Sequence, residues 1–562
     1  MPKAKPSKAG GFAASVILAL AIPLGAQTAD TILLNGKILT VDSRFSIQEA
    51  LAIRDGRIAA LGTTTEIRKL AGANTRVVDL QTRTVIPGLI DSHMHAIRAA
   101  LSFSTEVNWI GARTLAEALS RIRAAAQSKG PGKWLIVAGG WNVQQLQENR
   151  RPTQSELTAA APNNPVYVQL GYGWAMLTPR ALEALHITSE ADLPEHGRFE
   201  RDPSGKPTGA VTGGQDAIIA LFDRLPRPTF DEQVEGTRQF FRELNRLALT
   251  GVVDPGGNNL TPDDYQALFQ VWKQRQLTIR VAYTLCGLTP GAEFEDYKSW
   301  TRLLPMGFGD DLLRFNGIGE RITAAMNNND HPTDLDKEKY YQIAQWAADH
   351  SMSLTMHWPR DASVGQLLDI FERVNRETPI AGLRWSIAHL NDASPRTLER
   401  MKALGVGWTV QDAMYFGGAQ FVQQEGAAAA RRVPPVETAT RIGVMVGAGT
   451  DAHRVASYNP FTALQWFLDG KTVAGVSIRG PEETPSRAEA LRFYTVGSSW
   501  FSRDEDKRGS LEPGKLADLA VLSRDYMTAP VDQISGTESL LTMVGGKIVY
   551  AAGAFARLEQ KP

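Results

Sequence analysis

Cysteine is almost absent from this chain of 562 residues. The only cysteine is Cys286, so neither an intrachain disulfide nor a cluster of thiolate metal ligands can form within one chain. We expect Cys286 to be a buried, unreactive thiol. Histidine is also scarce, with nine residues, and their positions are therefore informative.

The chain also has no net charge. Lys+Arg and Asp+Glu number 60 each, and the formal net charge is zero. Nothing in this balance indicates nucleic acid or an anionic membrane as a partner. The length exceeds one ordinary core and predicts a large catalytic domain accompanied by a smaller one.

The first residues have the pattern of an export signal. Three lysines occur among the first eight residues, an apolar stretch spans 12–24, and Ala26 and Ala29 offer cleavage points. The apolar stretch is short for a bilayer span. We therefore predict a signal peptide over residues 1–29 and a periplasmic or secreted mature protein without an integral membrane span. An uncleaved N-terminal anchor is the alternative.

Both ends of the remaining chain are rich in predicted strands. Asn35-Gly36, Asp55-Gly56 and Gly545-Gly546 separate short apolar runs, which is a strong hairpin signal. Residues 30–86 and 501–562 therefore predict one small β-sandwich domain assembled from both termini.

The middle of the chain, residues 87–500, alternates apolar strands with amphipathic helices. This alternation favours an α/β fold, a (β/α)8 TIM barrel, with a doubly wound sheet as the alternative. Residues of about 100 to 230 exceed one β/α repeat and predict an insertion near the barrel mouth. Asp334 and Ser394 are the expected N-caps of two helices.

A histidine pair follows an apolar run and a Pro-Gly step near the start of this middle region. His93 and His95 are spaced i, i+2, so in an extended strand both imidazoles point to one side. Neutral imidazole is the commonest protein metal ligand. The pair could supply half of a divalent metal site, although two polar residues at a strand end would explain it equally well.

Three more polar residues stand at the ends of predicted strands, namely His357, His389 and Asp451. Each alone could be a hydrogen-bonded histidine or a helix-capping aspartate. In a barrel, however, the C-terminal strand ends meet at one mouth, where polar residues are typically catalytic. Five such residues at one face weaken these ordinary explanations and favour a functional site at the barrel mouth.

Several motifs of this chain resemble those of a known protein family. The run Pro87–His95, the order of the later strand-end residues and the tail Gly509–Leu522 resemble the amidohydrolase superfamily. The segment Arg201–Gly209 and the long insertion resemble, more narrowly, amidohydrolase family 3, which includes N-substituted formamide deformylases. The resemblance implies a metal-dependent hydrolase on a (β/α)8 barrel with a composite β-sandwich.

The resemblance also implies the ligand set. His93 and His95 would be the metal ligands of the first strand, His357 of the fifth, His389 of the sixth, and Asp451 the carboxylate of the eighth. Where a bridging lysine is usual on the fourth strand, this chain has Leu313–Glu320. Arg314 cannot be carboxylated as a lysine can, and Glu320 is the nearest substitute. We therefore expect one or two divalent ions of a zinc-like kind.

A hydrolytic mechanism follows from these roles. Asp451 would accept a proton from the attacking water and deliver it to the leaving group, and the metal with His357 or His389 would polarise the carbonyl. The expected substrate is a small molecule with a non-peptide C–N bond: an amide, cyclic amide, carbamate or N-formyl compound. An ester or lactone hydrolase and a non-catalytic binding barrel are the alternatives, and a homodimer is an open alternative to a monomer.

Other polar and aromatic residues are weaker candidates for the functional site. Asp91 could orient the histidine loop or serve as a turn or cap, and His453 could contact substrate. Asp361 and Arg360 could support the metal ligands or form a solvated surface pair. The aromatic side chains of the predicted insertion could line a substrate pocket or pack in its core; they are Trp109, Trp141, Tyr172 and Trp174.

Overall fold

The computed structural model of the protein describes residues 28–257 and 260–559. Nearly all of the signal peptide predicted over residues 1–29 lies outside this part of the chain. Among the described residues, no helix is long and apolar enough to cross a membrane.

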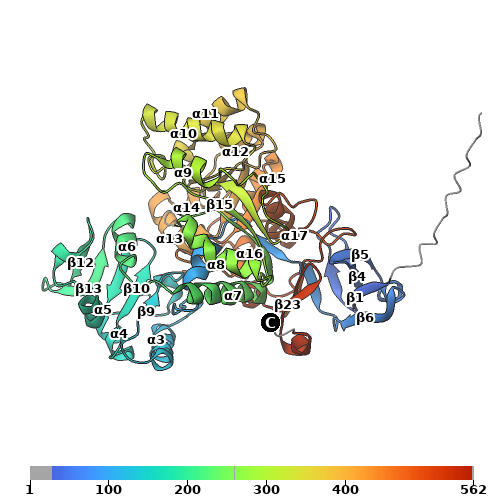
Figure 1. Cartoon of the computed structure of the whole chain (residues 1–562), viewed down its shortest axis with the longest axis horizontal. Coiled ribbons are helices and arrows are strands. Elements are labelled where there is room, and N and C mark those ends of the chain that lie inside the picture. Colours follow the sequence, from blue (N-terminus) through green and yellow to red (C-terminus); the bar gives the residue numbers. More distant parts are fainter. Residues whose placement is uncertain (1–27, 258–259, 560–562) are drawn as a thin grey trace, which may run out of the picture.

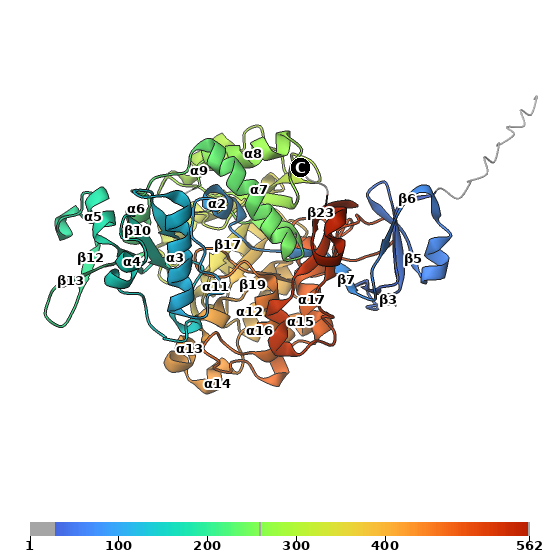
Figure 2. The same cartoon turned by 90° about the horizontal axis from the view of Figure 1, so that it is seen from below.

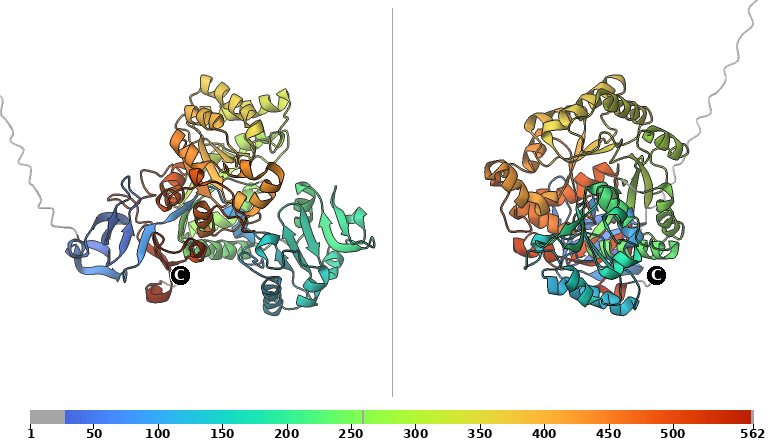
Figure 3. Two further views of the ribbon diagram at one scale, coloured as in Figure 1. Left: turned by 180° about the vertical axis from the view of Figure 1, so that it is seen from behind. Right: turned by 90° about the vertical axis from the view of Figure 1, so that its left-hand side faces the viewer.

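In the described part of the chain, eight parallel strands form a closed barrel (Figure 3). Two sheets, ordered β16-β15-β14-β8 and β17-β18-β19-β20, meet through a bridge between Ile318 and Leu354. On the opposite side, the two sheets meet between β8 and β20, where the Ser92 N–H donates to the Ala448 carbonyl at 2.9 Å. The strands are β8 (Leu89–Asp91), β14 (Leu249–Asp254), β15 (Arg280–Leu285), β16 (Leu313–Ile318), β17 (Thr355–Trp358), β18 (Ser386–His389), β19 (Gly407–Gln411) and β20 (Val446–Gly449).

Helices surround this barrel (Figure 1). The N-cap predicted at Ser394 is confirmed. The one at Asp334 is wrong, because the Thr333 hydroxyl accepts the Asp336 N–H while the Asp336 carboxylate accepts the Thr333 N–H. The helices are α2 (Ala96–Ser102), α7 (Phe230–Arg246), α8 (Gln266–Lys273), α9 (Glu293–Trp300), α10 (Asp334–Asp349), α11 (Asp361–Glu377), α12 (Pro395–Leu404), α13 (Ala413–Glu425), α14 (Ala427–Ala430), α15 (Val436–Ile442), α16 (Pro460–Asp469), α17 (Arg487–Arg492) and α18 (Ser498–Phe501).

A second α/β unit is inserted between β8 and β14. Its five strands are ordered β12-β13-β11-β10-β9, and it has a core of its own in which the Trp109 and Trp141 rings lie 5.1 Å apart. Trp174 is buried in the same core, so these three aromatics serve packing. The elements are α3 (Leu115–Lys129), β9 (Leu135–Val137), α4 (Gln154–Ala160), β10 (Val166–Leu170), β11 (Trp174–Leu177), α5 (Pro179–Ala184), β12 (Arg198–Arg201), β13 (Pro207–Thr212) and α6 (Gln215–Phe222).

The two ends of the chain build a β domain on the far side of the barrel from this insertion (Figure 2). Its sheets are ordered β5-β4-β1-β6 and β23-β22-β21-β7-β2-β3, and Leu33, Leu51, Val85 and Leu519 pack between them. The elements are β1 (Ala29–Leu34), β2 (Lys37–Leu39), β3 (Ile47–Gln48), β4 (Ala50–Arg54), β5 (Arg57–Gly62), α1 (Thr64–Arg68), β6 (Ala71–Asp79), β7 (Thr84–Pro87), β21 (Leu519–Leu522), β22 (Ser539–Val544) and β23 (Lys547–Ala551).

The predicted barrel and the domain from both termini are thus confirmed, and the doubly wound alternative is wrong. The residue boundaries assigned to the domains from the sequence stay a prediction.

A buried ion pair joins the barrel to the β domain. Arg280, at the start of β15, donates from Nε and Nη2 to the two carboxylate oxygens of Asp518 at 2.7 and 2.9 Å. Asp518 also accepts the Gly545 N–H at 2.7 Å. Both charged side chains are buried, so neither can exchange its partner for water.

We predict that Arg280→Met lowers the free energy of unfolding by about 3–5 kcal/mol, because it leaves the Asp518 charge buried without a counter-charge. Thermal denaturation should report a lower Tm. The double variant Arg280→Met/Asp518→Leu should regain most of the loss, since it removes both charges. A double variant as unstable as the single one would show that the ion pair is not the source of the effect.

Candidate metal centre

His93 and His95 come directly after the first barrel strand, β8, and both are buried. A carboxylate holds their backbone in place. Asp91 accepts the His93 N–H at 2.9 Å and the Thr450 hydroxyl at 2.8 Å. The segment that carries the histidines is therefore tied to the residue that follows β20, the last barrel strand.

Glu320 lies among the histidines, two residues beyond β16. Its Oε2 is 3.1 Å from His93 Nε2, and its Oε1 is 3.2 Å from His95 Nε2. The Oε2 atom is also 3.5 Å from His357 Nδ1 and 3.8 Å from His389 Nε2. One buried carboxylate is thus shared by four imidazoles.

The other two histidines come from neighbouring strands, His357 from β17 and His389 from β18. Their ring centroids are 4.2 Å apart, and the His389 ring is 5.2 Å from that of His93. The Gln411 side chain on β19 accepts the His389 N–H at 2.9 Å and so fixes the backbone that bears this imidazole.

Asp451 completes the cluster from the segment that follows β20. Its Oδ1 is 3.2 Å from His95 Nε2 and 3.7 Å from His93 Nε2, and its N–H donates to the His93 carbonyl at 2.8 Å. The six residues predicted as ligands therefore converge at one end of the barrel; they are His93, His95, His357, His389, Asp451 and Glu320.

The charges of the cluster favour a cation. Burial opposes ionisation of Glu320, but the histidines outweigh it and hold its pKa well below its usual range. Burial and the charge of Arg98 disfavour protonation of His95, yet Glu320 and Asp451 raise its pKa to about 10. The two carboxylates therefore attract positive charge. Burial and nearby His357 lower the pKa of His389 to about 4, which keeps this imidazole in the neutral form that binds metals.

The donor atoms fit a divalent ion. His95 Nδ1 lies 2.6 Å from the Gly256 carbonyl, which can only accept, so Nδ1 carries a proton and Nε2, which faces the two carboxylates, is the nitrogen that could bind a metal. His93 Nε2, His389 Nε2 and Glu320 Oε2 are buried without a hydrogen-bond partner among the described residues. Two groups with ligand atoms within 4.8 Å share Glu320: His93, His95 and Glu320, and Glu320, His357 and His389. Imidazole and carboxylate donors suit zinc.

A cavity of about 150 Å³ opens onto this cluster. His95, Glu320, His357 and Asp451 all line it. The inserted unit contributes Tyr172, from the turn between β10 and β11, and Gln215, the first residue of α6. Of the four aromatic residues singled out from the sequence, Tyr172 is thus the one that faces the cavity.

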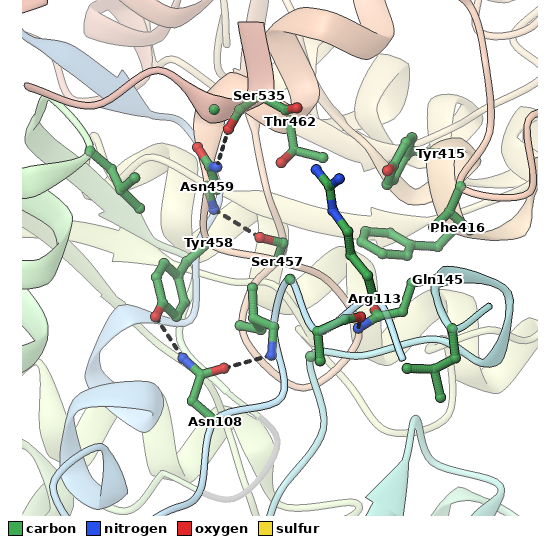
Figure 4. Close-up of a pocket in the computed structure, with 18 of the residues that line it drawn as sticks. Asn108, Arg113, Gln145, Tyr415, Phe416, Ser457, Tyr458, Asn459, Thr462 and Ser535 are labelled. Atoms are coloured by element: carbon green, nitrogen blue, oxygen red, sulfur yellow. Dashed lines mark hydrogen bonds between the residues drawn. The ribbon is translucent and has the colours of Figure 1, made fainter. Parts of the chain in front are cut away.

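A larger cavity of about 680 Å³ lies elsewhere, between the insertion and the barrel wall (Figure 4). None of the six candidate ligands lines it. Several of its polar side chains bond one another or the backbone instead: Asn108 donates to the Tyr458 hydroxyl at 2.7 Å, and Asn459 donates to the Ser535 carbonyl at 2.9 Å. The clustered titratable groups make the smaller cavity the candidate active site.

The lower-ranked polar residues have structural partners. His453 Nε2 lies 2.9 Å from Glu106 Oε2, and His453 does not line the smaller cavity. Asp361 accepts the Ser394 N–H at 2.9 Å. Arg360 forms an exposed ion pair with an aspartate on a neighbouring loop.

Sequence reasoning missed Arg98, Asn327 and Asn328, which also line the smaller cavity. Arg98 stands three residues after His95, and this closeness to the histidine pair in the sequence could have drawn attention to it. No comparable pattern marks the two asparagines, which lie in the long connection after β16.

Comparison with known proteins agrees with this geometry. The chain matches the family described as the amidohydrolase family over residues 76–550. It is also similar to an N-substituted formamide deformylase from Arthrobacter pascens, with 27% identity over 93% of this chain and 99% of that protein.

Solved structures share the fold. An uncharacterized metal-dependent hydrolase from Pyrococcus horikoshii aligns with a TM-score of 0.65 and 21% identity, covering 89% of this chain and 99% of that one. An adenosine deaminase from Xanthomonas campestris with bound zinc aligns with a TM-score of 0.55 and 14% identity, covering 93% of each chain.

We predict that the purified protein holds zinc or a similar ion, and that His93→Ala/His95→Ala loses it, because both removed nitrogens belong to the buried donor set. Elemental analysis per chain measures this directly. Chelation should also lower the Tm of the wild type, and zinc should restore it, since a ligand of the folded state stabilises by mass action. A wild type without metal after zinc addition would refute the site.

Proposed function

This chain belongs to the amidohydrolase family, and from that premise we propose that it hydrolyses a C–N bond, other than a peptide bond, in a small molecule. The candidate bonds are those of an amide, a cyclic amide, a carbamate and an N-formyl group. One observation carries the proposal: the Asp451 carboxylate lines the same small cavity as three of the clustered metal-binding residues.

The metal-dependent chemistry would rest on six residues, which we propose hold one or two zinc ions: His93, His95, His357, His389, Asp451 and Glu320. When bound, a divalent ion acidifies water and polarises a carbonyl. Glu320, which lies within reach of both groups of histidines, would bridge them if two ions bind.

Asp451 is the proposed proton carrier. Its side chain is 16% exposed, against 8% for Glu320, so it reaches the cavity further than the other carboxylate. Burial opposes its ionisation, but the hydrogen bond from His95 and the neighbouring histidines keep its pKa below the ordinary value. It can therefore accept a proton from the attacking water and return that proton to the leaving nitrogen.

The histidines of β17 and β18 would have different roles. The His357 side chain is 24% exposed and lines the cavity, whereas that of His389 is 6% exposed and lies behind it. We assign His357 to face the substrate carbonyl as its charge develops and His389 to complete the donor set.

A substrate panel tests the proposal. The similar protein named N-substituted formamide deformylase makes N-formyl compounds the first choice. Matched pairs of N-formyl amines and formate esters should be assayed with zinc-loaded wild type, with the chelated protein as the blank. Hydrolysis of the amides supports the proposal; hydrolysis of the esters alone would replace it with an esterase. Metal binding without any hydrolysis would favour a binding barrel.

We further propose that the chain is exported, on the basis of the signal pattern in residues 1–29. Expression in a Gram-negative host, followed by N-terminal sequencing of the periplasmic protein, tests this. A mature chain that starts at Gln27 or at Asp30 agrees with cleavage after Ala26 or after Ala29. A full-length chain retained at the membrane would favour the uncleaved anchor.

Asp451→Asn should lower kcat by at least about 100-fold while the protein remains folded, because an amide cannot accept the proton of water. The steady-state rate on an N-formyl amine and the Tm should be measured together. Asp334→Asn is the matched control, since this carboxylate is fully exposed on α10 and does not line the cavity of the cluster. A folded Asp451→Asn variant with a normal rate would contradict the proton-carrier role.

A further inference from the structure

Arg98 is a buried cation that has no partner in the described structure. It lies on α2, three residues after His95, and it lines the cavity of the metal centre. The residue is only 9% exposed, yet among the described residues it donates no hydrogen bond and forms no ion pair, and its Nε is buried unpaired. A buried charge in this condition is costly unless a ligand pairs with it.

The carboxylate of Asp254 is close enough to Arg98 for the two to interact, but it does not pair with it. Burial raises the pKa of Asp254, and the charge of Arg98 partly offsets this rise. Its two oxygens accept the Ile97 N–H at 2.8 Å and the Gly256 N–H at 2.9 Å. The carboxylate is therefore committed to backbone N–H groups of α2 and of the loop after β14. Arg98 forms no ion pair with any other carboxylate among the described residues.

The other buried arginines behave differently. Arg280 and Arg508 each pair with an aspartate. Arg454 donates to the Ala138 carbonyl at 3.1 Å, and Arg479 donates to the Phe467 carbonyl at 2.8 Å. Arg98 thus departs from the pattern that this protein follows wherever an arginine serves only structure.

Apart from Arg98 and the candidate metal ligands, the residues that line the cavity are neutral. Tyr172, Gln215 and Asn327 line it, and Arg98 is the only lysine or arginine among its described lining residues. The negative charges of Glu320 and Asp451 are those that a divalent ion compensates. An unpaired planar guanidinium beside a cation site favours an anionic group on the ligand, above all a carboxylate, which it can bind with two parallel hydrogen bonds.

We propose that Arg98 binds a carboxylate of the substrate, which makes this enzyme selective for small acidic amides. This inference rests on the proposed hydrolytic function. Arg98 follows His95, the residue before α2, by three positions, and both line the same small cavity, so a carboxylate bound to Arg98 would lie close to the bond cleaved beside His95. The cavity of about 150 Å³ is small for a ligand site and suits a compact acid.

A matched substrate pair tests the proposal. N-formylglycine and N-formylglycinamide carry the same scissile bond and differ in one charge. Zinc-loaded wild type should hydrolyse the acid with the higher kcat/KM. Arg98→Gln should lower kcat/KM for the acid by about 100-fold, the range for charge-assisted hydrogen bonds, and leave the neutral amide unchanged. The kcat/KM of Arg98→Lys for the acid should lie between those of wild type and Arg98→Gln, because lysine keeps the positive charge but cannot form two parallel hydrogen bonds.

Binding provides a readout apart from turnover. N-(methylsulfonyl)glycine cannot be deformylated, and calorimetry should give a Kd about 100-fold weaker for zinc-loaded Arg98→Gln than for wild type. Arg113→Gln, which removes an exposed arginine at the other cavity, is the control and should bind as the wild type does. The Tm of Arg98→Gln should not fall, because Arg98 has no hydrogen-bond or ion-pair partner to lose in the described part of the chain.

The outcomes separate this inference from the function on which it rests. If wild type cleaves both N-formyl compounds equally, or if Arg98→Gln slows both to the same extent, hydrolysis stands and carboxylate recognition fails. If neither compound is cleaved but the sulfonyl acid binds in a manner that depends on Arg98, recognition stands and hydrolysis fails. A loss of Tm and of all binding in Arg98→Gln would make the residue structural and overturn the inference.

Discussion

The candidate site depends on how the barrel closes. Asp91 is fully buried, and its carboxylate bonds both the backbone that carries His93 and the hydroxyl of Thr450, which precedes Asp451. Burial raises the pKa of Asp91 to about 7, a cost that the surrounding hydrogen bonds partly offset. This carboxylate joins the first and last barrel strands, so the candidate ligands that follow β8 and β20 keep a fixed separation.

Much of the site could be predicted because its residues obey local rules. Strand periodicity placed His93 and His95 on one side, and parallel strands bring their ends to one edge. Glu320 was inferred only as a substitute for an absent lysine, and the structure places it between all four histidines. The cap at Asp334 was wrong because Thr333, one residue earlier, offers the better hydroxyl acceptor.

The rest of the cavity could not be predicted, because it is made by tertiary packing of loops. The sequence leaves open whether Tyr172 lines a pocket or packs in a core, and only the docking of the inserted unit decides between the two; Gln215 has no signal in the sequence at all. Arg98 is close to His95 in the sequence, but its lack of a partner among the described residues is a property of the whole fold. The scaffold can thus be predicted from the sequence, whereas the residues that complete the cavity lining are brought together only by tertiary packing.

The pairing of β7 with β21 has a consequence for the order in which the protein is made. Ile86 lies beside Ala520, which follows the whole barrel in the sequence, and β8, which the histidines follow, comes directly after β7. The other edge of β7 pairs with β2 near the N-terminus, but its pairing with β21 can form only after the entire barrel has been synthesised. Chains that terminate before β21 therefore lack one of the two strands that hold β7, and with it part of the support of the segment that carries the histidines.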